Sequence, residues 1–382
     1  MISGSQGILV LEDGSVFHGR SVAAEGEWVG EVVFNTAVAG YQEVLTDPSY
    51  WGQMVCFTYP HLGNVGVNAS DDESGRVHVR AVIARQISRR PSNWRSTMGL
   101  PEYLLNQGVP ALEGIDTRRL TLLLREGGVM RAALSTVSDD VARLLDMARQ
   151  SPVMSVLRPI PLVSRQQSEA WVDPAEARWV QFTAVKADLP GIPPHVVVMD
   201  CGVKANILRT LLSAGARVTV VPHDTSATQV VALQPDGLLI ANGPGDPERA
   251  GPVIDAVREL MQAVPVLGIC MGQQVLALAA GARTYKMRFG HHGDNHPVQS
   301  LLTGAIEITS QNHNYAVDAD SFVGLPLEVT HRNLYDGTVE GLRHKTLPVA
   351  SVQFHPEAAP GPHDSLHIIY SFVASLSETR EA

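Results

Sequence analysis

Pro265-Val-Leu-Gly-Ile-Cys-Met-Gly-Gln-Gln274 is a short apolar run that ends in a cysteine between two glycines, and a helix-prone segment follows it to Ala280. The pattern predicts a strand, a sharp turn and a helix. The spacing Gly-x-nucleophile-x-Gly lets the chain turn tightly enough to hold the central side chain clear of the sheet. Cys270 would then lie at the amino end of the helix, where free backbone N–H groups and the helix dipole favour the thiolate. The stretch therefore predicts a nucleophilic cysteine.

A nucleophilic cysteine needs a base, and the base needs an orienting group. Val352-Gln-Phe-His-Pro-Glu357 contains both, far downstream in the chain. If residues 349–354 form a strand, His355 lies at its end, and Glu357 is close enough to fix the tautomer of the imidazole. Cys270, His355 and Glu357 are the predicted catalytic triad. The alternative, that Cys270 is only a buried apolar residue, leaves the two glycines unexplained.

The composition is that of an ordinary globular protein of two domains, with 382 residues, 45% hydrophobic and 18% charged. A net charge of −10 without any run of Lys or Arg argues against a nucleic-acid partner. Cys56, Cys201 and Cys270 are widely spaced, which argues against a disulfide framework and a zinc ribbon. No apolar run approaches the roughly 20 residues of a membrane span, and the amino terminus lacks a signal-peptide pattern. We expect a cytoplasmic protein without a membrane anchor.

Residues 1–150 predict a smaller domain of mixed α/β structure. Short extended segments between residues 7 and 86 predict a strand-rich layer. A helix that Asp116 caps and Gly127 ends should follow, then a strand over residues 129–134 and a helix that Ser138 caps.

Residues 151–194 contain seven prolines and little periodicity, so they predict a largely irregular linker. From residue 195 to 382, strands alternate with helices, which predicts an α/β domain with a central, mostly parallel sheet flanked by helices. Catalytic residues of such sheets gather at the carboxyl ends of the strands. Asn242 and Cys270 both follow predicted strands, over residues 237–241 and 265–269.

Residues 268–274, Asn242-Gly-Pro-Gly-Asp-Pro247 and His355-Pro-Glu357 resemble the class I, triad-type glutamine amidotransferases. Residues 40–50, residues 58–66, Phe289-Gly-His-His-Gly293 and Ser310-Gln-Asn-His313 are similar to the family of carbamoyl-phosphate synthetase small subunits. The likeness runs over nearly the whole chain. The triad motifs specify only the amidotransferase class, whereas the amino-terminal segments are specific to this one subunit.

The resemblance implies a glutamine-hydrolysing subunit, in which residues 195–382 are the class I amidotransferase domain and residues 1–150 the small-subunit amino-terminal domain. Cys270 would form a thioester with L-glutamine. The ammonia would pass to a large subunit that makes carbamoyl phosphate from bicarbonate for pyrimidine and arginine biosynthesis. No Gly-x-x-x-x-Gly-Lys loop occurs, so we expect no cofactor in this chain, with ATP and Mg²⁺ on the large subunit. The expected assembly is a heterodimer or a higher oligomer of heterodimers.

Attack on the amide of glutamine makes an oxyanion, which needs two N–H donors. The backbone of Met271 and the loop after Asn242 are the expected donors. Gln274 lies one turn beyond Cys270 and can aim its amide at the substrate. By resemblance, eight residues contact glutamine: Ser49, Gly243, Gly245, Met271, Gln274, Asn312, Asn314 and Tyr315.

Three residues depart from the family pattern: Gln273, Asn314 and Tyr315 stand where histidine, glycine and phenylalanine are common. Asparagine tolerates left-handed backbone better than most residues, so we expect the loop to survive the change at Asn314. Tyrosine keeps the aromatic ring of phenylalanine. These differences concern the affinity for glutamine rather than the reaction.

Other functions fit parts of the pattern. An amidotransferase subunit of another synthase would share the second domain but not residues 40–50 and 58–66. A cysteine peptidase would keep the elbow, but Gln274 and the Asn242 loop suit a small amino acid. A non-catalytic docking protein would not need an intact triad.

His291, His292 and His296 form a histidine-rich segment that raises the question of a metal site. The thiolate mechanism needs no metal, and the resemblance implies a structural loop there instead, so we expect no metal. Cys201 and Cys56 lack the paired glycines of an elbow, and we expect both to be packed thiols.

Overall fold

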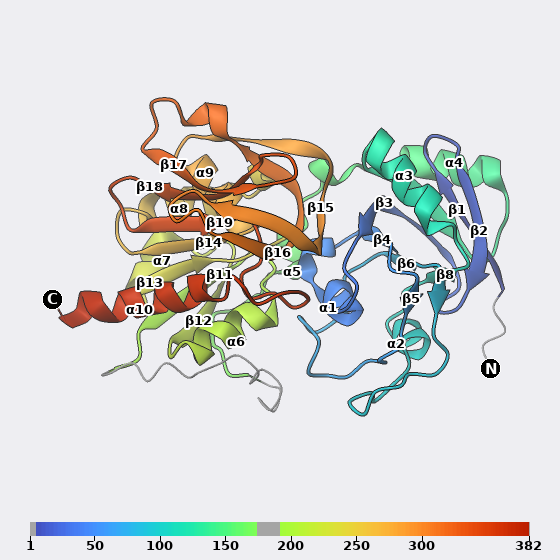
Figure 1. Ribbon diagram of the computed structural model, residues 1–382, viewed down its shortest axis with the longest axis horizontal. Helices are drawn as coiled ribbons and strands as arrows, with labels where there is room; N and C mark the ends of the chain where they lie inside the picture. The colour runs from blue at the N-terminus through green and yellow to red at the C-terminus, as the bar shows by residue number, and fades with distance from the viewer. Residues whose placement is uncertain (1–4, 174–191, 382) are drawn as a thin grey trace. The chain divides into compact units, whose positions relative to one another are not determined.

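The structure is a computed structural model that describes residues 5–173 and 192–381 (Figure 1). The chain divides into two units, residues 1–157 and 158–382. The first unit contains β1 (Gln6–Leu11), β2 (Val16–Ser21), β3 (Glu27–Asn35), α1 (Tyr41–Thr46), η1 (Pro48–Tyr50), β4 (Gln53–Phe57), β5 (His61–Leu62), β6 (Ala81–Ile83), β7 (Gln86–Ile87), α2 (Leu100–Asn106), β8 (Ala111–Glu113), α3 (Thr117–Gly127), β9 (Met130–Ser135), α4 (Val141–Gln150) and η2 (Met154–Val156).

The strands of the first unit form a closed barrel in the order β1-β2-β8-β6-β4-β3-β9. The sequence predicts a strand-rich layer, and the structure differs because the two ends of that layer pair with each other, with Leu9 opposite Leu134. Closure leaves no unpaired edge strand. Apolar side chains from β1, β4 and β9 pack against Leu120 and Leu124 of α3, so the predicted apolar face of that helix covers the barrel.

The two predicted helix caps of this unit have different outcomes. Asp116 caps α3, because its side chain accepts the backbone N–H of Arg119 at 2.9 Å. The prediction that Ser138 caps α4 is wrong, since Asp140 accepts the N–H of Arg143 at 3.1 Å. Asp140 immediately precedes the helix and is therefore the residue that reaches its free N–H groups.

The second unit contains α5 (Ile160–Val163), β10 (Glu169–Ala170), β11 (His195–Asp200), α6 (Ala205–Ser213), β12 (Arg217–Pro222), α7 (Ala227–Ala232), β13 (Gly237–Ile240), η4 (Pro247–Arg249), α8 (Gly251–Leu260), β14 (Val266–Ile269), α9 (Met271–Ala279), β15 (Arg283–Ser300), β16 (Ile306–Asp318), η5 (Ala319–Phe322), β17 (Leu327–Asn333), β18 (Val339–His344), β19 (Val349–Val352) and α10 (His367–Glu381). Ten strands form one sheet in the order β10-β12-β11-β13-β14-β19-β18-β17-β15-β16.

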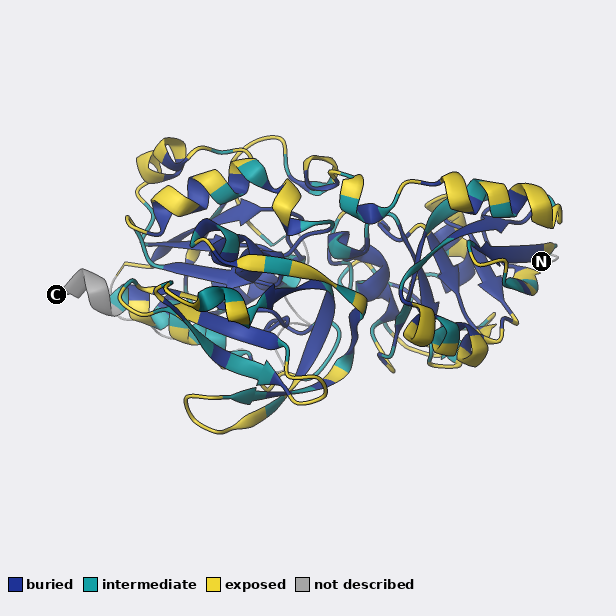
Figure 2. Ribbon diagram, turned by 90° about the horizontal axis from the view of Figure 1, so that it is seen from above, coloured by how far each residue is buried: buried dark blue, intermediate teal, exposed yellow. Residues whose placement is uncertain are grey.

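The predicted parallel sheet is confirmed for five neighbouring strands, β12, β11, β13, β14 and β19. Alternate residues of β11 face opposite layers, as strand geometry requires. Val196 and Val198 pack with α6 and α10, whereas Val197 and Met199 pack with α7, α8 and α9. Helices therefore cover both faces of the parallel part, and Figure 2 shows the strands as largely buried between them.

Beyond β19 the sheet continues as four antiparallel strands, β18, β17, β15 and β16. The long β15 and β16 carry the segments around residues 291 and 312 that the family resemblance singles out. This half of the sheet brings those segments beside the ends of the parallel strands.

The predicted linker, residues 151–194, is only partly irregular. Residues 158–173 belong to the second unit, where α5 packs Ile160 into its core and β10 pairs with β12 at the edge of the sheet. Residues 174–191 of that linker lie outside the described residues.

Within the part of the chain that the structure describes, no helix combines the length and the apolar character that crossing a membrane requires.

Candidate active site

Cys270 occupies a strained turn between β14 and α9. Its backbone has φ of 55° and ψ of −105°, a conformation that residues other than glycine rarely adopt. The flanking glycines permit this turn because neighbouring atoms lie too close for a side chain at either position. A Cβ on Gly272 would lie 2.1 Å from the carbonyl oxygen of Ile240, and one on Gly268 would lie 2.6 Å from Leu276 Cδ1. Strain of this kind persists where the surrounding structure enforces it, which is typical of functional sites.

The sheet brings the predicted base, His355, beside the predicted nucleophile, Cys270. The N–H of Cys270 donates to the carbonyl of Val352, at 2.9 Å, in the neighbouring strand β19. Three residues further on, the N–H of His355 donates to the carbonyl of Ser310 at 2.9 Å, which fixes the histidine backbone against β16. His355 Nδ1 lies 2.7 Å from Glu357 Oε1. All three predicted triad side chains are thus gathered at the carboxyl ends of β14 and β19, and all are buried.

The charges of His355 and Glu357 stabilise each other. Burial alone would lower the pKa of His355, but the Glu357 carboxylate outweighs it, and the pKa is raised to about 10, with Cys270 also contributing to the rise. Burial alone would raise the pKa of Glu357, but Lys204 and then His355 lower it to about 2. The two shifts together hold an imidazolium on His355 beside a carboxylate on Glu357.

Lys204 is a residue of this site that sequence reasoning missed. Its Nζ donates to Glu357 Oε1 at 3.0 Å and to the carbonyl of Ala358 at 2.6 Å, and the side chain is buried. Its backbone N–H donates to Asn242 Oδ1 at 3.2 Å, so Lys204 also contacts the predicted oxyanion loop. The available signal was a lysine just after a predicted strand, at the sheet edge where functional residues gather.

The expected oxyanion donors lie at the start of α9 and in the loop after β13. Met271 is the first residue of α9, so its N–H has no acceptor within the helix. Gly243 approaches the neighbouring chain closely, because a Cβ there would lie 2.2 Å from the carbonyl oxygen of Cys201. Gly245 follows with φ of 92°. The role of these residues toward an oxyanion stays a prediction.

Three of the expected glutamine contacts meet in the structure. Gln274 is buried, and its Nε2 donates to the carbonyl of Tyr315 at 2.8 Å and to Gln353 Oε1 at 3.0 Å. Gln274 therefore does not face solvent. The backbone carbonyl of Asn312 accepts a hydrogen bond from Cys270 Sγ at 3.5 Å. Strand β16 thus carries Asn312 and Tyr315 directly past the nucleophile.

The structure shows the surroundings of the three residues that depart from the family pattern, Gln273, Asn314 and Tyr315. Asn314 does not have a positive φ, so the expected need for left-handed backbone at this position is wrong. The residue lies inside β16, where backbone is extended. Gln273 is buried, and its amide lies 3.3 Å from the Val339 carbonyl and 3.4 Å from Ser351 Oγ. Tyr315 is buried.

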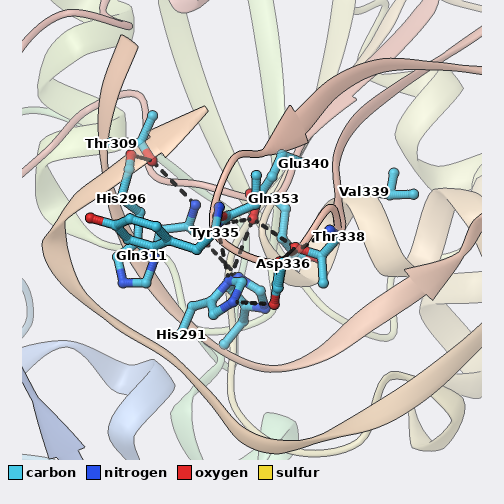
Figure 3. A network of polar contacts seen from close by, with 12 residues as sticks. His291, His296, Thr309, Gln311, Tyr335, Asp336, Thr338, Val339, Glu340 and Gln353 are labelled. Carbon is cyan, nitrogen blue, oxygen red and sulfur yellow. Dashed lines mark hydrogen bonds and ion pairs between the residues drawn. The ribbon is translucent and has the colours of Figure 1, made fainter. Parts of the chain in front are cut away.

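His291, His292 and His296 lie in strand β15, so the expected loop is wrong. The segment pairs with β16, and its polar side chains are buried by partners distant in sequence. Figure 3 shows the polar network around His291, whose Nε2 lies 2.9 Å from Asp336 Oδ2 and whose Nδ1 lies 3.5 Å from Glu340 Oε1. Burial would lower the pKa of His291, but hydrogen bonds to the two carboxylates raise it to about 9.

His291, His313 and Glu340 also place possible ligand atoms within 4.8 Å of one another. The nitrogens of both histidines already engage protein groups. His313 Nδ1 donates to the Tyr315 carbonyl at 2.8 Å, and its Nε2 lies 2.6 Å from Gln311 Oε1. We assign the cluster as a polar network that holds β15 and β16 against the turn between β17 and β18.

Ser49 lies in η1 of the first unit, where its N–H donates to Asp47 Oδ1 at 2.8 Å. It is the only expected glutamine contact outside the second unit, and its role stays a prediction. Cys56 and Cys201 are buried thiols. Burial raises the pKa of Cys56 to about 12 and raises that of Cys201 as well, which disfavours a reactive thiolate at either position.

Two family models match the chain. The model described as glutamine amidotransferase class-I matches residues 197–375. The model described as carbamoyl-phosphate synthase small chain, CPSase domain, matches residues 9–134. Together they match most of both units.

Several curated relatives match almost end to end, and each is named carbamoyl phosphate synthase small chain. The relative from Nostoc sp. is 49% identical over 376 residues, which cover 98% of this chain and 96% of the relative. The one from Synechocystis sp. is 50% identical over 375 residues, with 98% and 96% covered. The one from Xanthomonas campestris is 50% identical over 374 residues, with 98% of both chains covered.

Proposed function

Because the chain belongs to the family of carbamoyl phosphate synthase small chains, we propose that it hydrolyses glutamine and supplies ammonia to a large ATP-dependent chain that makes carbamoyl phosphate. The observation that carries this proposal is the buried triad, with Cys270 on a strained elbow and His355 held 2.7 Å from Glu357.

The first half of the reaction is acylation of the cysteine. Cys270 Sγ, as thiolate, attacks the side-chain amide carbon of glutamine, and the carbonyl oxygen becomes an oxyanion that the N–H groups of Met271 and Gly243 stabilise. His355 Nε2 donates its proton to the leaving nitrogen as the C–N bond breaks. Ammonia leaves, and a γ-glutamyl thioester remains on Cys270.

The second half releases glutamate. His355, now neutral, takes a proton from a water molecule that attacks the thioester carbon. The C–S bond breaks, the thiolate returns, and the imidazolium forms again beside Glu357. Throughout, Glu357 holds Nδ1–H, so that Nε2 is the nitrogen that moves protons. Lys204 keeps Glu357 ionised by adding a second positive charge to the same carboxylate.

The family implies a large synthetase partner, and we propose a heterodimer or an oligomer of heterodimers in the cytoplasm. The absence of disulfides among the three cysteines fits a compartment that keeps thiols reduced. ATP and Mg²⁺ belong to the large chain in this proposal, and this chain needs neither to cleave the amide.

Substitution of Cys270 by serine tests the division of labour. We expect the complex of the Cys270→Ser chain with the large chain to lose glutamine-dependent carbamoyl phosphate synthesis and to keep ammonia-dependent synthesis, because only the nitrogen source is removed. The measurement is carbamoyl phosphate formed from each nitrogen donor. Cys201→Ser, the same change at a buried cysteine after β11, should keep both activities. Equal loss of both activities in Cys270→Ser would contradict the proposal.

A further inference from the structure

His292 lies opposite Asn312 in the pairing of β15 with β16. Its Nδ1 is 3.0 Å from Asn312 Oδ1, and its Nε2 is 3.1 Å from Asn314 Oδ1. Residues two apart in a strand share a face, so one ring can reach both amides. His292 is 2% exposed, and its contact with Asn312 is buried, whereas its contact with Asn314 is partly buried.

Gly290 makes room for this arrangement. A Cβ at that position would lie 2.6 Å from Asn314 Oδ1 and 2.7 Å from His292 Nε2, and its φ is +71°. Any side chain at residue 290 would therefore enter the space where the ring and the amide meet. The backbone oxygen of His313, also 2.6 Å from such a Cβ, and the positive φ require glycine here as well, so the backbone and the two side chains all depend on the absence of a side chain at residue 290.

The orientation of the two amides follows from the contact. A side-chain amide carries an oxygen that accepts and an N–H₂ group that donates. A His292 ring with a proton on each nitrogen donates to both amide oxygens, and both N–H₂ groups are then turned away from the ring. Asn312 also presents its backbone carbonyl to Cys270 Sγ, so these donors lie on the strand that passes the nucleophile. Glutamine brings a carboxylate, for which N–H donors are the matching partners.

We propose that His292 is a positioning residue for the substrate, holding the amides of Asn312 and Asn314 so that their N–H groups meet the α-carboxylate of glutamine. This inference rests on the proposed function, since it assumes glutamine as the substrate. His292 acts through the asparagines and does not take part in the bond-making steps. It also accounts for Asn314, a residue found where glycine is common, as one half of a coupled pair.

The test is steady-state glutamine hydrolysis by the complex with the large chain. His292→Leu should raise KM for glutamine by about tenfold, the scale of one lost charge-assisted hydrogen bond, while kcat changes by less than about twofold. His292→Gln, which keeps one polar contact, should recover part of the affinity. Ammonia-dependent synthesis should not change in either variant. An unaltered KM in His292→Leu, or a fall in kcat without a rise in KM, would overturn the assignment.

His296→Gln is the matched control, because His296 is a buried histidine of the same strand and should leave KM for glutamine unaltered. Asn314→Gly completes a double-mutant cycle. It should raise KM in the natural chain and add little once His292 is leucine, because the two side chains act as a unit. Fully additive effects would overturn the coupling.

If circular dichroism shows that His292→Leu does not fold, the test uses Asn314→Gly alone. An unaltered KM for glutamine in Asn314→Gly would then overturn the inference. A natural complex that releases no ammonia from glutamine would refute the proposed function instead, so the two failures are distinguishable.

Discussion

Glu357 carries two positive partners in a site from which water is excluded. His355 and Lys204 both contact Oε1, at 2.7 and 3.0 Å, and all three side chains are buried. A buried ion pair adds little when intact, but removal of one member leaves a charge without compensation. The carboxylate therefore matters to the stability of the site as well as to the orientation of the base.

Glu357→Gln should lower stability by about 3–5 kcal/mol, the scale for breaking a buried ion pair, and should reduce glutamine hydrolysis as severely as His355→Asn. The measurements are the midpoint temperature of unfolding and the rate of ammonia release. In the double variant Glu357→Gln, Lys204→Met, stability should recover, because the uncompensated ammonium is gone, while hydrolysis stays low. An unchanged midpoint temperature in Glu357→Gln would show that Lys204 does not depend on this carboxylate.

At the scale of elements, the start of α9 depends on the absence of a side chain at Gly272. Gly272→Ala should abolish glutamine hydrolysis and lower the midpoint temperature, because the added Cβ meets the backbone oxygen of Ile240, which cannot move without shifting β13. Gly251→Ala is the control, since Gly251 also lies in the first turn of a helix and nothing lies within 4 Å of an added Cβ. The control should be neutral or slightly stabilising. Equal behaviour of the two variants would contradict the steric explanation of the elbow.

Strand β15 carries a charge that makes its stability depend on pH. The pKa of His291 is raised from 6.5 to about 9, so its interactions with Asp336 and Glu340 stabilise the fold fully below pH 6.5 and are lost as the pH rises toward 9. His291→Gln should therefore lower the midpoint temperature at pH 6 by more than at pH 9.5.

His296→Gln provides the comparison for this pH series. Burial, and then the charges of His291 and His292, lower the pKa of His296 to about 3, so that residue is neutral in the folded chain throughout the series. In the unfolded chain its pKa returns to the ordinary value, so the effect of His296→Gln on the midpoint temperature should be constant above about pH 7.5 and should not change as the pH rises through 9. A pH-independent effect of His291→Gln would mean that the His291 charge contributes nothing to stability.

The two halves of the large sheet were not equally predictable. The parallel strands are apolar runs such as His195–Asp200, set between helices, and this pattern is local. The central residues of β15 and β16 include His, Asn and Gln. They are buried because partners distant in the sequence satisfy their polar groups, as Asp336 and Glu340 do for His291. Burial through distant partners also explains why Lys204 was missed, whereas Cys270 and its glycines form a motif within five residues.

For the whole molecule, the two units have separate cores, and we predict separate tasks for them. The predicted elbow, base and oxyanion loop all lie in residues 158–382, and the first unit contributes one predicted glutamine contact, Ser49. We expect residues 1–157 to dock on the large chain and residues 158–382 alone not to co-purify with it. Circular dichroism would establish that each fragment folds. A folded 158–382 fragment that binds the large chain as tightly as the full chain would show that docking belongs to the second unit.

The closure of the barrel in the first unit also lay beyond sequence reasoning. Strand composition predicted the segments between residues 7 and 86, but β1 pairs with β9, more than a hundred residues away. Pairing over such a distance in the sequence depends on the packing of the whole unit. Local sequence patterns do not predict it.

The pairing of β14 with β19 has a consequence for the growing chain. The two strands lie side by side, yet β15, β16, β17 and β18 are made between them. Synthesis proceeds from the amino terminus. The ribosome therefore adds Cys270 first and adds His355 only after all four antiparallel strands. A truncated or unfinished chain carries the cysteine without its base, so we expect it not to hydrolyse glutamine until His355 has been added.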